Sequence, residues 1–138
     1  MERLEALRVD LAALSADGEA EVPLLPAAIA YAERIRDVAD QPARLLAHHY
    51  TRYLGDLSGG QALGSIFGRA LGIESGQPGI SFYQFEGIEK VKPCKDRYRE
   101  LLDGAPLSDE ESDAAVEEAV VAFRCNQALF EELESLRD

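Results

Sequence analysis

Residues 50–72 read YTRYLGDLSGGQALGSIFGRALG and contain six glycines. The apolar residues between the glycines still recur at the spacing of a helix, at Leu63, Ile66, Phe67 and Ala70. Each glycine in a helix interior costs roughly 0.5–1 kcal/mol relative to alanine. The stretch therefore either interrupts a helix or serves a contact that needs bare backbone.

The glycine spacing narrows this choice. Glycines 55, 59, 60, 64 and 68 fall largely at four-residue steps, which places most of them on one side of a helix. Gly72 suits the C-cap. No apolar segment long enough to cross a bilayer accompanies them, so helix contact in a membrane is not indicated. Two interpretations stay open: close packing or a turn at GDLSGG, and a broad, flat ligand lying on the backbone.

Outside this stretch the pattern predicts an all-α protein. A length of 138 residues is typical of one domain, so residues 1–138 are expected to form a single domain. A first helix is expected over about 2–15, ending in SADGEAEVP (15–23). Pro26 and Pro42 suit first helical turns, and the second of these helices runs into the glycines. Residues 73–87 predict an irregular connection. Further helices are expected over 88–102 and, after a capping box at Ser108 and Glu111, to about 136.

The composition excludes several classes of function. A net charge of −12 argues against a nucleic-acid partner, which requires a basic surface. The chain shows no targeting leader and no membrane segment, and a cytoplasmic location is expected. Cys94 and Cys125 have neither metal nor redox spacing, which predicts free thiols in a reducing compartment.

The basic residues cluster in KVKPCKDRYR (90–99), which holds five of the fourteen Lys and Arg residues beside one acid, Asp96. Such a cluster serves either a small anionic ligand or a solvated helix face. Lys95 and Arg99 lie four residues apart on one face, a spacing that suits two carboxylates or one phosphate.

Four further polar residues stand in apolar surroundings. Asp56, between Leu54 and Leu57, is either exposed in a turn or hydrogen-bonded beside the glycine surface. Asn126, on the apolar side of the last helix, is a satisfied core amide or a functional one. The adjacent His48 and His49 point in different directions and cannot chelate one metal together, so both are interpreted as core residues and no metal ligand is assigned.

Three segments together resemble the haem oxygenase family of the bacterial, biliverdin-producing type. AHHYTRYLGDLSGGQALG (47–64) is similar to the distal-helix signature of that family. FYQFEGIEKVKPCKDRYRELL (82–102) and AFRCNQALFEEL (122–133) are similar to its later helices, in the same order and at the same spacing. The resemblance implies a haem oxygenase-like helical bundle, incomplete at its N-terminus, with a kinked glycine-rich distal helix.

The implied reaction is the oxidation of haem by dioxygen to biliverdin, carbon monoxide and ferrous iron. Haem would be both cofactor and substrate, and an electron-donating reductase or ferredoxin-type protein would be the partner. The resemblance assigns a catalytic hydrogen-bond network, in which a carboxylate holds ordered water near the dioxygen, to Asp56, Tyr50, Arg52 and Asn126.

It also implies a haem-binding set. The bare backbone would lie against the porphyrin, two cations would bind its propionates and aromatic residues would line its pocket. The residues are Gly55, Gly59, Gly60, Lys95, Arg99, Phe82 and Phe123, with Tyr83 and Phe130 as pocket or supporting aromatics.

The family's iron ligand is a proximal histidine on its first helix, and this chain shows no counterpart of it. The chain corresponds to roughly the last two thirds of a family member, either as a fragment or as a reduced relative. Two other functions stay open: a non-catalytic haem-binding or haem-sensing remnant that uses His48, His49 or no protein ligand at all, and an acidic all-α interaction module that binds no haem.

Overall fold

A computed structural model describes residues 3–15, 23–85, 87–88 and 90–136. Over those ranges every regular element is helical, which confirms the all-α prediction. The elements are α1 (Leu4–Leu14), α2 (Pro26–Asp37), α3 (Pro42–His49), the π-helix η1 (Tyr50–Leu54), α4 (Gly55–Leu71), the 3₁₀ helix η2 (Ser81–Tyr83), α5 (Val91–Asp103) and α6 (Asp109–Ser135). The expected end of the first helix falls partly on residues 16–22, which lie outside the described ranges.

Local sequence signals set most of the helix ends. Pro26 and Pro42 open α2 and α3, as predicted, because a helix has no use for the N–H that proline lacks at its first position. Gly72 follows α4 with φ of +69°, the left-handed conformation of a helix C-cap. Ser108 and Glu111 form the predicted capping box at the start of α6. The helix of the basic cluster begins later than expected, at Val91.

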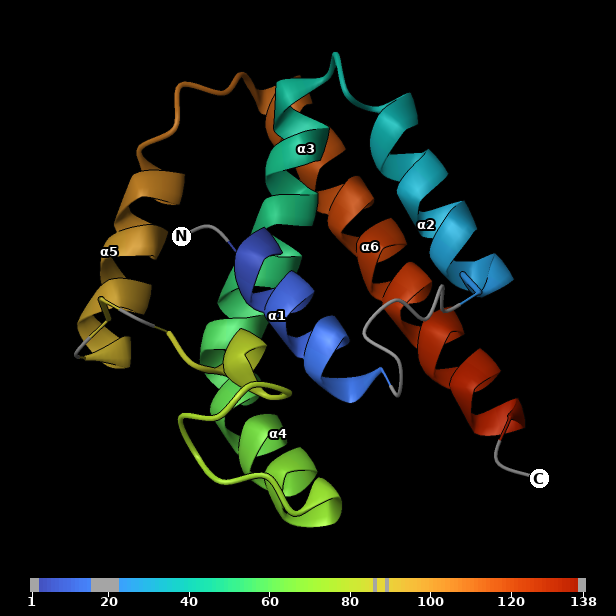
Figure 1. Cartoon of the computed structure of the whole chain (residues 1–138). Coiled ribbons are helices and arrows are strands. Elements are labelled where there is room, and N and C mark those ends of the chain that lie inside the picture. The colour runs from blue at the N-terminus through green and yellow to red at the C-terminus, as the bar shows by residue number, and fades with distance from the viewer. Residues whose placement is uncertain (1–2, 16–22, 86, 89, 137–138) are drawn as a thin grey trace. The chain divides into compact units, whose positions relative to one another are not determined.

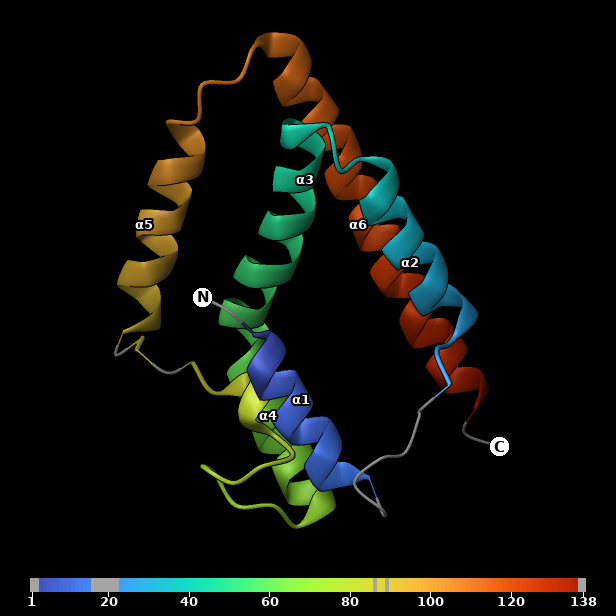
Figure 2. The ribbon, with the colours of Figure 1, turned by 45° about the horizontal axis from the view of Figure 1, so that its top comes forward.

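The chain divides into two compact units. The first comprises the described part of Met1–Val22 together with Gly55–Glu100, and the second comprises the described part of Pro23–Leu54 and Leu101–Asp138. In the second unit, α2 and α3 both pack along α6, as Figures 1 and 2 show from two directions. Its buried residues are mostly small, and include Val38, Ala43, Ala47 and Ala122.

In the first unit, α1 and α4 both pack against η2. The buried residue of α1 is Asp10, whereas the leucines whose spacing predicts this helix are exposed by 41–59%. The Asp10 carboxylate accepts backbone N–H hydrogen bonds from Gly79 (2.8 Å), Ser81 (2.8 Å) and Phe82 (2.7 Å). This acid therefore holds the segment that leads into η2.

No helix in the described part of the chain is both long enough and apolar enough to cross a membrane.

Candidate functional site

The glycines of α4 fall into two groups, and the first group is closely packed. A Cβ atom added to Gly64 would lie 2.7 Å from Cβ of Tyr83, and one added to Gly68 would lie 2.9 Å from the carbonyl oxygen of Ile73. At Gly60 the added atom would meet the ring of Phe85 at 3.4 Å. The packing interpretation therefore holds for Gly64 and Gly68, whereas the contact at Gly60 has an ordinary van der Waals length.

Gly55 and Gly59 behave differently. A Cβ atom added to either would meet no atom of the described residues within 4 Å. Both glycines are exposed, Asp56 between them is half-buried, and Leu57 is buried in the core. Packing does not account for glycine at these two positions, so the first turns of α4 present bare backbone to open space.

Immediately before these glycines the chain forms the π-helix η1. Such turns are rare and are found frequently at functional sites. The buried Thr51 donates its hydroxyl hydrogen bond to the carbonyl of Ala47 at 2.8 Å. Tyr50, which the resemblance assigns to the catalytic network, begins this turn and is half-buried. Arg52, from the same network, lies two residues further on.

Arg52 and Asn126 are brought together within the second unit. Arg52 Nη1 donates to Asn126 Oδ1 at 2.9 Å. Asn126 Nδ2 in turn donates to the carbonyl of Ala122 at 2.9 Å and to the hydroxyl of Tyr31 at 3.4 Å. The Asn126 amide is therefore satisfied at both ends, and it links α6 to η1 and to α2. Burial raises the pKa of Tyr31, and the hydrogen bond from Asn126 opposes this rise.

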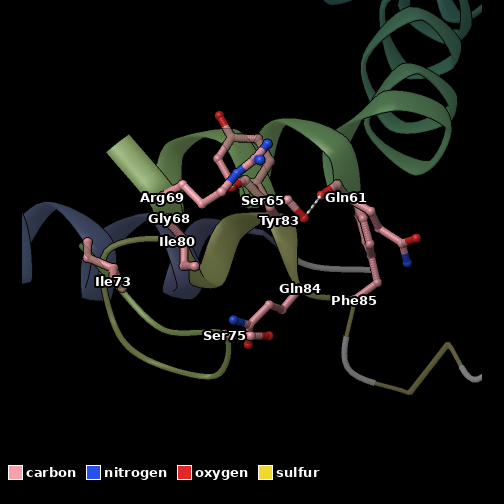
Figure 3. Close-up of a pocket in the computed structure, with 11 residues that line it drawn as sticks. Gln61, Ser65, Gly68, Arg69, Ile73, Ser75, Ile80, Tyr83, Gln84 and Phe85 are labelled. Atoms are coloured by element: carbon pink, nitrogen blue, oxygen red, sulfur yellow. Dashed lines mark hydrogen bonds between the residues drawn. The ribbon is translucent and has the colours of Figure 1, made fainter. Parts of the chain in front are cut away.

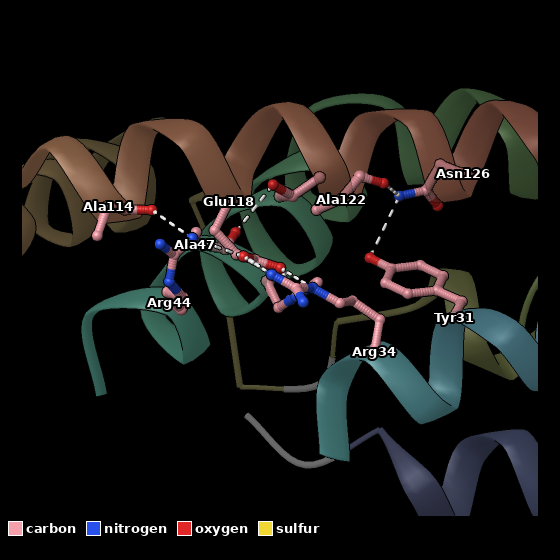
Figure 4. A network of polar contacts seen from close by, with 10 residues as sticks. Tyr31, Arg34, Arg44, Ala47, Ala114, Glu118, Ala122 and Asn126 are labelled. Carbon is pink, nitrogen blue, oxygen red and sulfur yellow. Dashed lines mark hydrogen bonds and ion pairs between the residues drawn. The ribbon is translucent and has the colours of Figure 1, made fainter. Parts of the chain in front are cut away.

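The most enclosed charged group in the second unit is Glu118 of α6, whose side chain is 0% exposed (Figure 4). Its carboxylate accepts hydrogen bonds from Arg34 Nε (2.8 Å), Arg44 Nη1 (3.0 Å) and His48 Nε2 (3.0 Å), and a further short one from Arg34 Nη2. The hydrogen bond from Arg34 is the largest of the contacts that hold its pKa at about 2. No local sequence pattern marks this residue, because its partners lie 70 or more positions away.

The two histidines occupy different environments. His48 is 5% exposed, which confirms its interpretation as a core residue. Its Nδ1 has no hydrogen-bond partner among the described residues. The same interpretation of His49 is wrong: His49 is exposed and stacks on Tyr53, with 4.2 Å between ring centroids. Partial burial lowers the pKa of His49.

The basic cluster lies on α5. Lys95 Nζ is 3.4 Å from Ser58 Oγ, which places this cation beside the open glycines of α4. Arg99 and Lys92 both pair with Asp96, at 3.3 Å and 2.9 Å. The hydrogen bond from Lys92 is the main reason for the lowered pKa of Asp96. Much of the cluster is thus a solvated face with local ion pairs, and Lys95 is the member that reaches α4.

The predicted aromatic residues divide between the two units. The Arg3 guanidinium lies over the ring of Phe82, with its central carbon 4.9 Å from the ring centroid. The rings of Phe82 and Tyr83 meet edge to face, with 5.3 Å between their centroids. Phe123 and Phe130 of α6 are exposed by 60% and 67%. Gly55, Asp56, Gly59 and Lys95 therefore share the first unit with Phe82, while Tyr50, Arg52 and Asn126 share the second with Phe123.

A pocket of about 410 Å³ lies in the first unit (Figure 3). Gln61, Ser65 and Arg69 of α4 line one side of it, and Ser75 and Gln84 lie opposite. Tyr83, predicted as a pocket or supporting aromatic, lines this pocket, but no other residue predicted from the sequence as catalytic or haem-binding does. It is bounded by the packed glycines 64 and 68, and is not the candidate site.

Comparison with known proteins agrees with the sequence resemblance. The family model described as "Heme oxygenase" matches residues 1–132. The chain is 42% identical over 136 residues to heme oxygenase 1 of Nostoc sp., and covers 57% of that protein. Among solved structures, heme oxygenase from Leptospira interrogans superposes with a TM-score of 0.85 at 40% identity, covering 94% of this chain and 64% of the other.

A second solved structure is heme oxygenase-2 of Synechocystis in complex with heme and NO. It superposes with a TM-score of 0.89 at 35% identity, covering 97% of this chain and 57% of that one. The chain spans about half the length of the curated relatives that it matches.

Proposed function

This chain belongs to the haem oxygenase family, and on that premise we propose that it functions in the oxidative cleavage of haem to biliverdin, carbon monoxide and ferrous iron. The observation that carries this proposal is the open backbone at Gly55 and Gly59, where an added Cβ would meet nothing within 4 Å among the described residues. A planar ring can lie against such a surface, because no side chain holds it away.

The proposal gives α3, η1 and α4 one role, as the glycine-rich distal helix of a single domain. These elements follow one another without a break from Pro42 to Leu71. The π-helical turn at 50–54 would supply the kink of this helix, since inserting a residue into the hydrogen-bond ladder is a known cause of bending. The kink would bring the backbone of the following turn toward the porphyrin.

Charge and aromatic contacts would orient the ring. Lys95 reaches α4 at Ser58, so its ammonium group lies near the proposed haem surface and would bind a propionate. Arg99, four residues on, would bind the second propionate in exchange for its exposed pair with Asp96. The resemblance assigns Phe82 and Phe123 to apolar pocket wall, and Gly60, which already contacts Phe85, would help to shape the bend.

Bound haem would supply the iron at which dioxygen is reduced and the ring carbon that is oxidised. The chain's own contribution would be hydrogen bonding. The Asp56 carboxylate would hold ordered water and deliver protons through it, which is gentler than direct donation from a strong acid. Arg52, Asn126 and Tyr50 would support this network, and the bond between Arg52 and Asn126 is the part of it seen within one unit.

The partners would be haem, dioxygen and an electron-donating reductase or ferredoxin-type protein. The net charge of −12 supports the absence of a nucleic-acid partner. Cys94 and Cys125 are both free thiols, which supports a reducing, cytoplasmic setting.

Titration with ferric haem, followed by absorption, tests the proposal. Gly55→Leu should weaken binding by about ten-fold or more, because the side chain would fill the open space. Ala62→Leu is the matched control, since it adds a leucine at an exposed position of the same helix and should change the affinity by less than about two-fold. Equal loss in both variants, or no binding by the unmodified chain, would contradict the proposal.

The role of the basic cluster is tested in the same assay. Lys95→Gln should weaken haem binding, because it removes the cation of α5 that contacts Ser58 of α4. The control is Lys92→Gln, which should leave haem binding unchanged. The Lys92 side chain is 88% exposed and, in the described part of the chain, pairs only with Asp96. If both variants bind haem like the unmodified chain, the assignment of α5 to propionate binding fails.

A non-catalytic haem-binding remnant is the second candidate, and the histidines separate it from the first. His48 is held by Glu118, whereas the exposed His49 could approach iron. A low-spin ferric complex that disappears in His49→Ala would favour this candidate. A chain that binds no haem would instead fit the acidic interaction module.

A further inference from the structure

Glu118 is a buried charge that the proposed chemistry does not use. We propose that it is a positioning residue, which fixes the register of α3 and η1 along α6 and so holds Arg52 against Asn126. This inference rests on the proposed function, because it matters only if Arg52 and Asn126 support the haem site.

The contacts of Glu118 occupy all of the hydrogen-bond acceptor sites of its carboxylate. Oε1 accepts from Arg34 Nε and His48 Nε2, and Oε2 accepts from Arg34 Nη2 and Arg44 Nη1. Each oxygen therefore uses both of its lone pairs. The donors come from α2 and α3, so one side chain of α6 joins both of the helices that pack on it (Figure 4).

The same contacts define how α3 and α6 are aligned. Arg44 Nη1 also donates to the carbonyl of Ala114 at 3.5 Å, His48 binds Glu118, and Arg52 binds Asn126. Position numbers increase together on both elements, so the two run in the same direction. Sliding one helix past the other by a single turn, about 5.4 Å, would break every contact in this series.

A buried charge resists such sliding more than apolar packing does. Ala43, Ala47 and Ala122 are buried residues of α3 and α6, and small side chains of similar shape allow several registers, so along these two helices apolar packing specifies the alignment weakly. A displaced Glu118 would keep its charge but lose its donors, which is strongly unfavourable inside a protein. Setting a register is the best-attested use of buried polar groups, and here the register decides whether Arg52 meets Asn126.

The test compares Glu118→Gln with Glu117→Gln in the ¹⁵N-labelled chain. Glu117 is the adjacent acid, its side chain is 71% exposed, and it lies 3.6 Å from Arg44, so its substitution removes the same charge without disturbing the buried contacts. The readout is the side-chain amide signal of Asn126, assigned by its absence in Asn126→Ser, together with backbone hydrogen exchange at residues 50–54.

In Glu118→Gln the Asn126 signal should shift toward that of a solvated amide, and exchange at 50–54 should accelerate by about ten-fold or more. Glu117→Gln should leave both unchanged. A folded Glu118→Gln chain with an unaltered Asn126 signal would overturn the proposal, and so would equal effects of the two substitutions.

Two further measurements keep the outcome decisive. If Glu118→Gln does not fold, His48→Leu takes its place, because it removes one donor to Glu118 but leaves both arginine contacts. His48→Leu should shift the Asn126 amide signal in the same direction. An unchanged signal would overturn the proposal. The ferric haem titration is run in parallel. An unmodified chain that binds no haem would contradict the proposed function. The Asn126 amide signal and the hydrogen exchange at residues 50–54, both measured without haem, would still test whether Glu118 fixes the register.

Discussion

Arg52 Nη1 donates a 2.9 Å hydrogen bond to Asn126 Oδ1 and so joins η1 to α6 across 74 positions of sequence. The other end of the Asn126 amide donates to Ala122 and Tyr31, which fixes its orientation. Arg52 is exposed, so the bond contributes little to stability. Its importance is geometric, because it fixes how η1 is aligned along α6.

The Tyr31 hydroxyl reports on this arrangement. Burial raises its pKa and the hydrogen bond from Asn126 lowers it, so Asn126→Leu should raise the pKa of Tyr31 further. Its titration can be followed through the ring carbon signals of Tyr31 by NMR. Gln127→Leu, at the exposed neighbouring position, is the control and should leave the pKa where it is. A lower pKa in Asn126→Leu would contradict the hydrogen bond.

The two groups of glycines should respond oppositely to alanine. Gly64→Ala should destabilise the chain by about 1–3 kcal/mol, because the new Cβ would lie 2.7 Å from the Cβ of Tyr83, which cannot swing away. Gly55→Ala should instead stabilise it by roughly 0.5–1 kcal/mol, since the space is open and alanine is the better helix former. Urea unfolding measures both, and changes of the same sign would refute the division.

Acid should remove the contribution of Glu118. Its folded pKa of about 2 lies below the ordinary value of 4.5, so its stabilisation is complete above pH 4.5 and declines as the pH falls toward 2. A difference of this size corresponds to about 3 kcal/mol. The free energy of unfolding should therefore differ between the unmodified chain and Glu118→Gln near pH 7, and the two should converge near pH 2. Parallel pH curves would show that Glu118 is not held by its cations.

Asp10 should be the critical acid of the first unit. Asp10→Asn removes the charge that three backbone N–H groups share, and should lower the free energy of unfolding by about 1–3 kcal/mol. Glu5→Gln alters an exposed acid on the same helix, whose 3.7 Å pair with Arg8 contributes little, and should change stability by less than about 0.5 kcal/mol. Thermal unfolding distinguishes them, and similar losses would show that the Asp10 hydrogen bonds are not special.

Helix positions follow closely from local chemistry. Proline at a first turn, a left-handed glycine after a last turn and the Ser108 capping box act through residues within four positions of one another, so the printed sequence contains the whole interaction. Family membership followed similarly from three contiguous segments. The π-turn at 50–54 was not predicted, because a single inserted residue leaves no periodic signature in so short a segment.

By itself the sequence determined the all-α class, most of the helix limits and the unusual glycines, since these depend on propensities and spacing along one chain. Only the tertiary structure decided which glycines are packed and which are open, because that depends on Tyr83, Phe85 and Ile73 arriving from a later segment. It also decided that Asp10 and Glu118 are the buried acids among the residues that the structure describes. A carboxylate is tolerated in a protein interior only where donors converge on it, and those donors come from residues 69–84 positions away, beyond the reach of any local pattern.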